Sequence, residues 1–172
     1  MKYSLITLFL LLSAVVTSTA QEFMFMVDET LSSKRISDIY QDHDGFIWVS
    51  TDNGLNRFDG NKVFAYNHVE GDTLSLIHDL VYTSYEDDDM HLFVGTYLGM
   101  QYLDKRTNRF SSYAVYADGR DFDETVSGFC KLPDGSICSF GDNAYKVTIA
   151  NGKPVASELD WDIDAHGVFR VA

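Results

Sequence analysis

A segment of this sequence recurs at a constant shift of 45 residues. Residues 36–55 return as residues 81–100, and a weaker third copy begins at Val126 in the same frame. No gap is needed between the copies, and a further copy in that frame would begin at residue 171. Periods of about 20–50 residues are typical of chains built from stacked supersecondary units. The repeat therefore constrains the fold more than composition does.

Each copy has the pattern of four short strands separated by turn dipeptides. In the first copy we expect strands at about 36–41, 46–50, 55–58 and 63–66, separated by Asp44-Gly45, Asn53-Gly54 and Asp59-Gly60. Asn-Gly and Asp-Gly tolerate the positive φ that tight hairpin turns require, so consecutive strands should pair antiparallel. We therefore predict that each copy forms one four-stranded antiparallel sheet.

The second strand of each copy indicates how the sheets are arranged. Residues 46–49 read Phe-Ile-Trp-Val and residues 92–94 read Leu-Phe-Val, which are apolar at consecutive positions. Such runs are expected in sheets covered on both faces. A period of 45 residues with four strands per unit fits propeller blades. We therefore predict an all-β, partial β-propeller of about three blades, at 32–79, 80–124 and 125–170.

Composition and net charge limit the classes of partner that the chain can bind. The chain is 45% hydrophobic and 14% aromatic, which suits a packed core. Its formal net charge is −13, which repels phosphate backbones and anionic lipid headgroups. We expect no nucleic-acid partner and no membrane contact by the mature segment.

The first 20 residues read as a signal peptide. Lys2 supplies a positive start, residues 5–16 are mainly apolar, and Ser18-Thr19-Ala20 places small residues at a cleavage site. We predict cleavage after Ala20 and a periplasmic location; an uncleaved anchor is the alternative. Export would place the two cysteines in an oxidising compartment.

The first copy contains a specific pattern of residues: Ile36, Ile39, Gln41-Asp42, Gly45, Ile47-Trp48, Thr51, Gly54-Leu55 and Phe58-Asp59-Gly60. These residues resemble the two-component regulator propeller repeat. The second copy departs from the pattern at Glu86, Met90 and Phe93, and the third carries Gly141 and Ala144 in place of the Thr and the second Gly.

The resemblance implies a function and a larger protein. It suggests that residues 21–172 are the N-terminal portion of the periplasmic sensor region of a hybrid two-component system histidine kinase from Bacteroidota. Such regions bind oligosaccharides outside the cytoplasm and signal to the kinase. The kinase and output domains would lie outside this chain, so we expect a fragment. The resemblance also suggests that residues 23–27 supply the outer strand of the last blade.

No binding residue can be assigned from the resemblance, because ligand sites in such regions lie on loops without a fixed motif. Three blades leave apolar faces open, so the remaining blades or self-association are the expected partners. A carbohydrate-active propeller enzyme and a stand-alone propeller-forming binding protein stay open as alternatives. The sequence supports no catalytic residue and no cofactor.

Cys130 and Cys138 flank a predicted hairpin turn around Asp134-Gly135, which places them opposite each other. Directly opposed strand residues lie about 4.5–5.5 Å apart, within disulfide range. A Cys130–Cys138 disulfide is therefore a candidate, and two free thiols packed as small apolar side chains are the alternative.

Other residues that could bind a metal or a sugar have a simpler explanation. The acidic turns at 42–45 and 87–89 could attract calcium, but they lack the spacing of an EF-hand loop and are expected to be solvated. The five histidines are scattered without zinc-site spacing, so we predict no metal. Trp161 with Asp160, Asp162 and Asp164 could contact a sugar or mark a strand edge.

Overall fold

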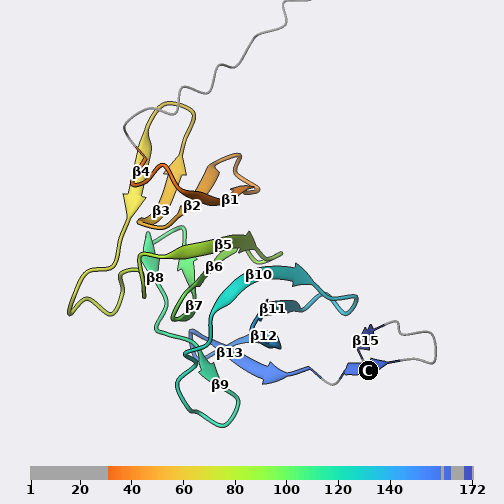
Figure 1. Ribbon diagram of the computed structural model, residues 1–172. Coiled ribbons are helices and arrows are strands. Elements are labelled where there is room, and N and C mark those ends of the chain that lie inside the picture. The colour runs from red at the N-terminus through yellow and green to blue at the C-terminus, as the bar shows by residue number, and fades with distance from the viewer. Residues whose placement is uncertain (1–30, 160, 164–168, 172) are drawn as a thin grey trace, which may run out of the picture.

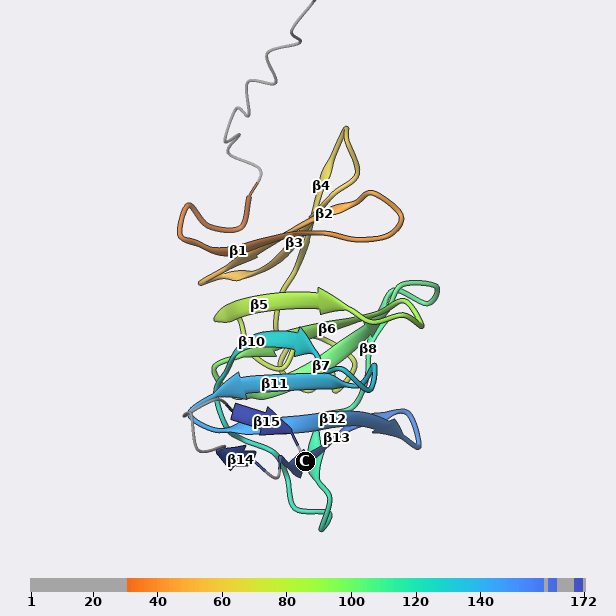
Figure 2. The same ribbon diagram turned by 90° about the vertical axis from the view of Figure 1, so that its right-hand side faces the viewer.

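The computed structural model describes residues 31–159, 161–163 and 169–171. All regular elements within these residues are β-strands. They form three sheets that lie one above the other (Figure 2) and a separate two-stranded hairpin. The all-β prediction is confirmed, whereas the predicted signal peptide and the 23–27 strand lie outside the described residues.

The first sheet forms as the first copy predicts, in the order β1-β2-β3-β4. Its strands are β1 (Ile36–Gln41), β2 (Ile47–Thr51), β3 (Gly54–Phe58) and β4 (Val63–Tyr66) (Figure 1). Gly54 opens β3 with a φ of 108°, and a Cβ there would lie 2.5 Å from the carbonyl oxygen of Tyr66. Glycine is therefore required at this turn.

The second sheet repeats the first with the 45-residue shift, in the order β5-β6-β7-β8. Its strands are β5 (Val81–Glu86), β6 (His91–Thr96), β7 (Gly99–Asp104) and β8 (Arg109–Phe110). Equivalent positions pair across the first two strands of all three sheets: Tyr40 with Trp48, Tyr85 with Phe93, and Cys130 with Cys138. A register shift also recurs at the start of each first strand, directly after the pairs made by Ile36, Val81 and Val126. The three copies are therefore the same structural unit.

The third sheet differs from the prediction by one strand. Its order is β10-β11-β12-β13-β9. The strands are β9 (Val115–Tyr116), β10 (Val126–Lys131), β11 (Ile137–Gly141), β12 (Ala144–Ala150) and β13 (Lys153–Glu158). β9 pairs parallel with β13, through Val115 with Val155 and Tyr116 with Ala156. The chain leaving the second sheet thus adds a fifth strand to the third sheet.

The first two sheets bury a shared core between them. Trp48 and Leu55 lie on the face of the first sheet turned toward the second, which we call its leading face. Leu92, Val94 and Leu103 meet them from the trailing face of the second sheet, and all five are fully buried. Complete burial of such a side chain contributes about 1.5–3 kcal/mol. The consecutive apolar residues of β2 and β6 are explained by burial on both faces.

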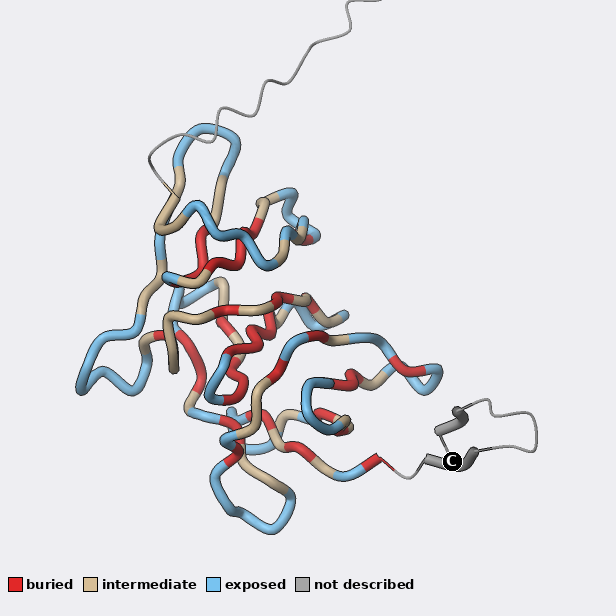
Figure 3. The backbone as a smooth tube through the Cα atoms, viewed as in Figure 1, coloured by how far each residue is buried: buried red, intermediate tan, exposed pale blue. Residues whose placement is uncertain are grey.

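The second and third sheets pack in the same way. Phe93 and Met100, on the leading face of the second sheet, share a buried cluster with Ile137 and Val147 of the third. The rings of Phe93 and Phe129 have centroids 6.0 Å apart across this interface. Figure 3 shows the buried positions gathered where the sheets face one another. One leading face therefore meets one trailing face at each interface.

The stack does not close into a ring within the described residues. On the trailing face of the first sheet Ile39 is 61% exposed, and on the leading face of the third sheet Phe140 is 44% exposed. Both positions belong to strands whose equivalents in the second sheet are covered. The fold is a partial β-propeller, as predicted.

Two buried amides attach the linkers that precede the sheets. Asn56 Nδ2 donates to Ser32 Oγ at 2.8 Å, and Ser32 N donates to Asn56 Oδ1 at 2.9 Å. In the second sheet Gln101 Nε2 donates to the Ser75 carbonyl at 3.2 Å, and Ile77 N donates to Gln101 Oε1 at 2.6 Å. A polar residue buried in the third strand thus holds each linker in place.

Candidate functional site

The hairpin turns that join the first two strands of each sheet emerge at one edge of the stack, which we call the turn edge. It comprises residues 42–46, 87–90 and 132–136, together with the β7–β8 turn at 105–108. These turns lie together because the same hairpin opens every sheet. The turn edge is the first candidate site.

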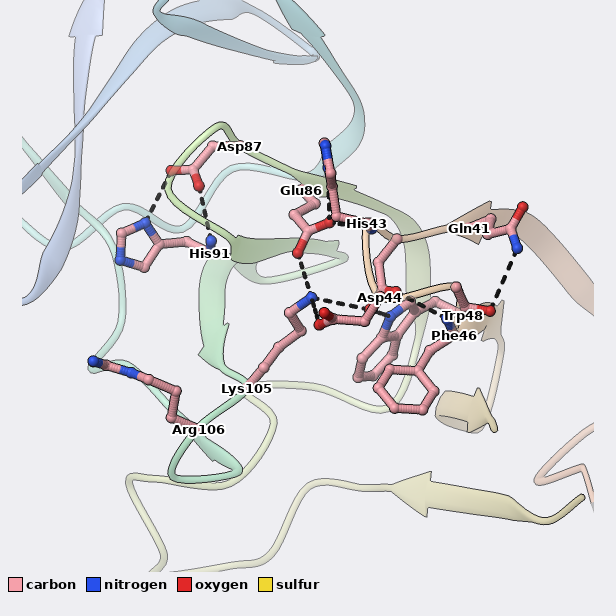
Figure 4. A network of polar contacts seen from close by, with 12 residues as sticks. Gln41, His43, Asp44, Phe46, Trp48, Glu86, Asp87, His91, Lys105 and Arg106 are labelled. Atoms are coloured by element: carbon pink, nitrogen blue, oxygen red, sulfur yellow. Dashed lines mark hydrogen bonds and ion pairs between the residues drawn. The ribbon is translucent and has the colours of Figure 1, made fainter. Parts of the chain in front are cut away.

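Lys105 lies at the centre of a polar network on this edge (Figure 4). Its ammonium group is 3.2 Å from Asp42 Oδ2 and 2.7 Å from Asp44 Oδ2, and it forms an ion pair with Glu86. The side chains of Asp42 and Glu86 are fully buried, and that of Lys105 is 10% exposed. The network therefore joins the second sheet to the β1–β2 turn of the first sheet.

The two buried carboxylates also accept hydrogen bonds from the first sheet. Asp42 Oδ2 accepts the Trp48 indole N–H at 2.8 Å, and its Oδ1 accepts Phe46 N at 2.9 Å. Glu86 Oε2 accepts the backbone N–H of His43 at 2.7 Å. Each carboxylate therefore stabilises a backbone turn as well as the cation.

The charges of the network shift two pKa values. Burial acts to lower the pKa of Lys105, but hydrogen bonds to Asp44, Glu86 and Asp42 outweigh burial and raise it well above its ordinary value. The hydrogen bond from Lys105 holds the pKa of Asp44 below its usual range. Three carboxylates surround one ammonium group, so the cluster has an excess of negative charge.

The acidic turns weighed as calcium ligands are placed here. Oxygens of Asp42, Asp44 and Glu86 come within 4.8 Å of one another, and Lys105 lies among them. In the next turn Asp87 Oδ1 accepts His91 N at 2.8 Å, and Asp87 Oδ2 lies 3.0 Å from His91 Nδ1. Groups of the protein itself therefore contact these carboxylates.

Sequence reasoning missed both Glu86 and Lys105. Glu86 takes the repeat position of Gln41, and this exchange of an amide for a carboxylate was the available signal. Lys105 follows β7 in a turn, and no pattern in the sequence points to its carboxylate partners. Only folding brings the β1–β2 turn, the end of β5 and the β7–β8 turn together.

Cys130 and Cys138 are cross-strand partners, as predicted, and both are free thiols in the structure. Cys130 is exposed and Cys138 is buried. Burial, with a smaller effect of the neighbouring Cys130, raises the pKa of the Cys138 thiol to about 11. The disulfide, which requires oxidation, stays a prediction.

A second polar cluster holds the segment between the second and third sheets against the third sheet. The hydroxyls of Tyr116 and Tyr145 each donate to Glu124 Oε1 at 2.6 Å, and Asn143 Nδ2 donates to Glu124 Oε2 at 3.0 Å. Burial and the bond to Glu124 raise the pKa of Tyr116 well above its ordinary value. This cluster fixes the segment that carries β9.

The opposite edge, which we call the loop edge, consists of the β2–β3 and β6–β7 turns and the linker 67–80. Tyr97 is 50% exposed there, and its ring lies 5.6 Å from that of His78 between centroids. Asp79 Oδ1 accepts His68 N at 2.7 Å, and the Asp79 carbonyl accepts Gly54 N at 2.6 Å. The half-exposed ring of Tyr97, in the β6–β7 turn, thus packs against a linker held by hydrogen bonds.

The remaining residues named from the sequence do not gather into one site. His43 lies in the β1–β2 turn, His68 and His78 lie on the linker 67–80, and His91 begins β6, each near partners of its own. His166, Asp160 and Asp164 lie outside the described residues. Trp161 and Asp162 belong to the hairpin formed by β14 (Trp161–Ile163) and β15 (Phe169–Val171).

Comparison with known proteins identifies the repeat. The family model described as two component regulator propeller matches residues 30–53. That segment contains β1 and β2 with the acidic turn between them. The comparison with curated proteins returned no match. The resemblance read from the first copy is therefore confirmed by the family model.

Two solved structures have a similar fold. One is the extracellular domain of a protein described as the one component system BT4673 from B. thetaiotaomicron, at 20% identity over 71% of this chain with a TM-score of 0.56. The other is described as the extracellular domain of the hybrid two component system BT4673, at 20% identity over 71% of this chain with a TM-score of 0.57.

This chain spans 18% of the length of each of those two chains. Among the described residues there is no helix whose length and hydropathy would let it cross a membrane. The stacked sheets agree with the family model and with the structural neighbours. The chain therefore carries a two-component regulator propeller repeat and folds as part of a β-propeller.

Proposed function

We propose that this chain is part of the extracytoplasmic sensor region of a hybrid two-component regulatory system. The observation that carries the proposal is the family match at residues 30–53, which coincides with the first hairpin of the stack. The extracellular domains with a similar fold support an extracytoplasmic location, as does the leader predicted at residues 1–20. The role is to bind a ligand, and a kinase elsewhere in the system receives the signal.

The ligand we propose is an oligosaccharide, and its contact surface is the loop edge. Apolar C–H groups of a sugar ring pack on exposed aromatic rings, while its hydroxyls need hydrogen-bond partners. Tyr97 offers a half-exposed ring supported by His78. The exposed Asn53 and the partly exposed Asn67 lie on the neighbouring turn and linker. The turn edge is less suited, because its buried carboxylates are engaged with Lys105.

A glycan array probed with the purified mature chain tests this proposal, followed by calorimetry on each glycan that binds. We expect Tyr97→Ala to weaken binding at least about tenfold, which corresponds to about 1.4 kcal/mol. Phe64→Ala is the matched control, since Phe64 is an exposed aromatic within β4 rather than on the loop edge. Absence of glycan binding, or equal losses in the two variants, would contradict the proposal.

A further inference from the structure

The C-terminal hairpin has the strand register of the hairpin that opens each sheet. Trp161 pairs with Val171, and Ile163 pairs with Phe169. In the first sheet the corresponding pairs are 39 with 49 and 41 with 47, which have the same separations along the chain. The register of β14–β15 is thus that of β1–β2, shifted by 122 residues.

The sequence around this hairpin agrees with the same alignment. An aspartate directly follows the first strand at Asp42, Asp87 and Asp164. A glycine stands two residues before the second strand at Gly45 and Gly167. We propose that β14 and β15 are the first two strands of a fourth blade, and that the leading face of the third sheet is its docking surface.

A constant 45-residue frame hides this copy and places the next one at residue 171. The first sheet is followed by a linker at 67–80, whereas β13 ends at Glu158 and β14 begins at Trp161. The position of Ile39 in the repeat recurs at Ser84 and Phe129 with the full period, then at Trp161 after only 32 residues. The missing linker accounts for the shorter spacing.

The hairpin divides its residues by polarity. Alternate residues of a strand lie on opposite faces, so positions 161, 163, 169 and 171 share one face, and 162 and 170 share the other. The first set is Trp, Ile, Phe and Val, and the second is Asp and Arg. When β14–β15 is aligned with β1–β2, the four apolar positions fall on the trailing face. In the second and third sheets this face packs on the preceding sheet.

The third sheet offers an apolar surface in the matching place. Cys130 and Cys138 take the positions of Tyr40 and Trp48 on its leading face. Cys138 clusters there with Leu132, Leu159 and Ala144. The two interfaces already formed in this chain each join a leading face to a trailing face, and this surface is the next leading face in the series.

One residue difference between the second and third sheets shapes this surface. A Cβ on Gly95 would lie 2.6 Å from the Val126 carbonyl, so the second sheet needs a residue without a side chain where the third approaches. The third sheet carries Phe140 at that position, paired with Gly128 and covering it. The fourth blade therefore meets an aromatic ring where the earlier interfaces have a small residue.

Alkylation of Cys130 with a neutral thiol reagent tests the docking, using the reduced full chain in its native state. Cys130 is exposed where the hairpin stands apart from the third sheet, so docking should slow its alkylation. We expect Phe169→Gln to remove this protection and raise the rate about tenfold. Arg170→Gln is the matched control, because it introduces the same residue at the next position on the opposite face. We expect it to stay within about twofold of the wild-type rate, and equal rates in all three proteins would overturn the proposal.

A second measurement separates docking from general unfolding. Hydrogen exchange of the wild-type chain should detect slowed amides in both 161–163 and 169–171. If Phe169→Gln also exposes the buried Cys138, the exchange result decides: protected hairpin amides support the proposal, and amides that exchange at unprotected rates overturn it. Neither readout depends on a ligand, so failure here is distinct from failure of glycan binding.

Discussion

Replacing Lys105 by methionine would remove the ammonium group from the network that joins the first two sheets. Asp42 and Glu86 would then remain fully buried without their cation. Removing one partner of a buried ion pair costs about 3–5 kcal/mol, because the other charge is left uncompensated. We expect Lys105→Met to lower the free energy of unfolding at neutral pH by about this amount.

Urea unfolding followed by tryptophan fluorescence is a suitable assay, since Trp48 is buried and donates to Asp42. Lys146→Met is the matched control: Lys146 pairs with Asp134 at 2.6 Å, but their side chains are 37% and 53% exposed. Exposed pairs contribute about 0–1 kcal/mol. Equal, small losses in the two variants would refute the reasoning.

The pH dependence supplies an independent check on the same network. The raised pKa of Lys105 means that its contribution is complete below the ordinary value of 10.5 and is lost as pH rises through the folded value. The lowered pKa of Asp44 means that its contribution is present above 3.8 and is lost as pH falls through the folded value. The difference between the wild type and Lys105→Met should therefore be nearly constant near neutral pH and shrink in acid.

Three further predictions concern the interfaces and the cysteines. Gly95→Ala should cost about 1–3 kcal/mol in urea unfolding, because the new Cβ would meet Val126, and an unchanged midpoint would argue against close contact there. Ile39→Asp should reduce self-association measured by light scattering, since Ile39 is 61% exposed on an open apolar face; equal association in both proteins would exclude that face. Exported protein alkylated under denaturing conditions without reductant should keep its mass if Cys130 and Cys138 are bonded, whereas addition of two alkyl groups would exclude the disulfide.

Local features of the fold could be predicted from the sequence. The strands of the first sheet agree with the expected ranges within one residue at each end, and Cys130 faces Cys138 as the turn at Gly135 predicts. These features depend on turn dipeptides and on the alternation of neighbouring residues. Such determinants act over a few positions of the chain, so the repeat pattern is sufficient to locate them.

Contacts between copies could not be predicted in the same way. Lys105 meets carboxylates 61 and 63 residues away, and β9 leaves the second repeat to pair with β13. Each of these features depends on how sheets approach one another rather than on the residues of one hairpin.

The sequence by itself determined the repeating hairpins, the apolar second strands and the acidity of the turns, because each is encoded within one copy. Only the tertiary structure decided which carboxylates share Lys105, which strand completes the third sheet and which faces stay open. The physical reason is that a blade buries its faces against its neighbours, so the partners of a buried charge or an apolar face are chosen by stacking and not by position along the chain.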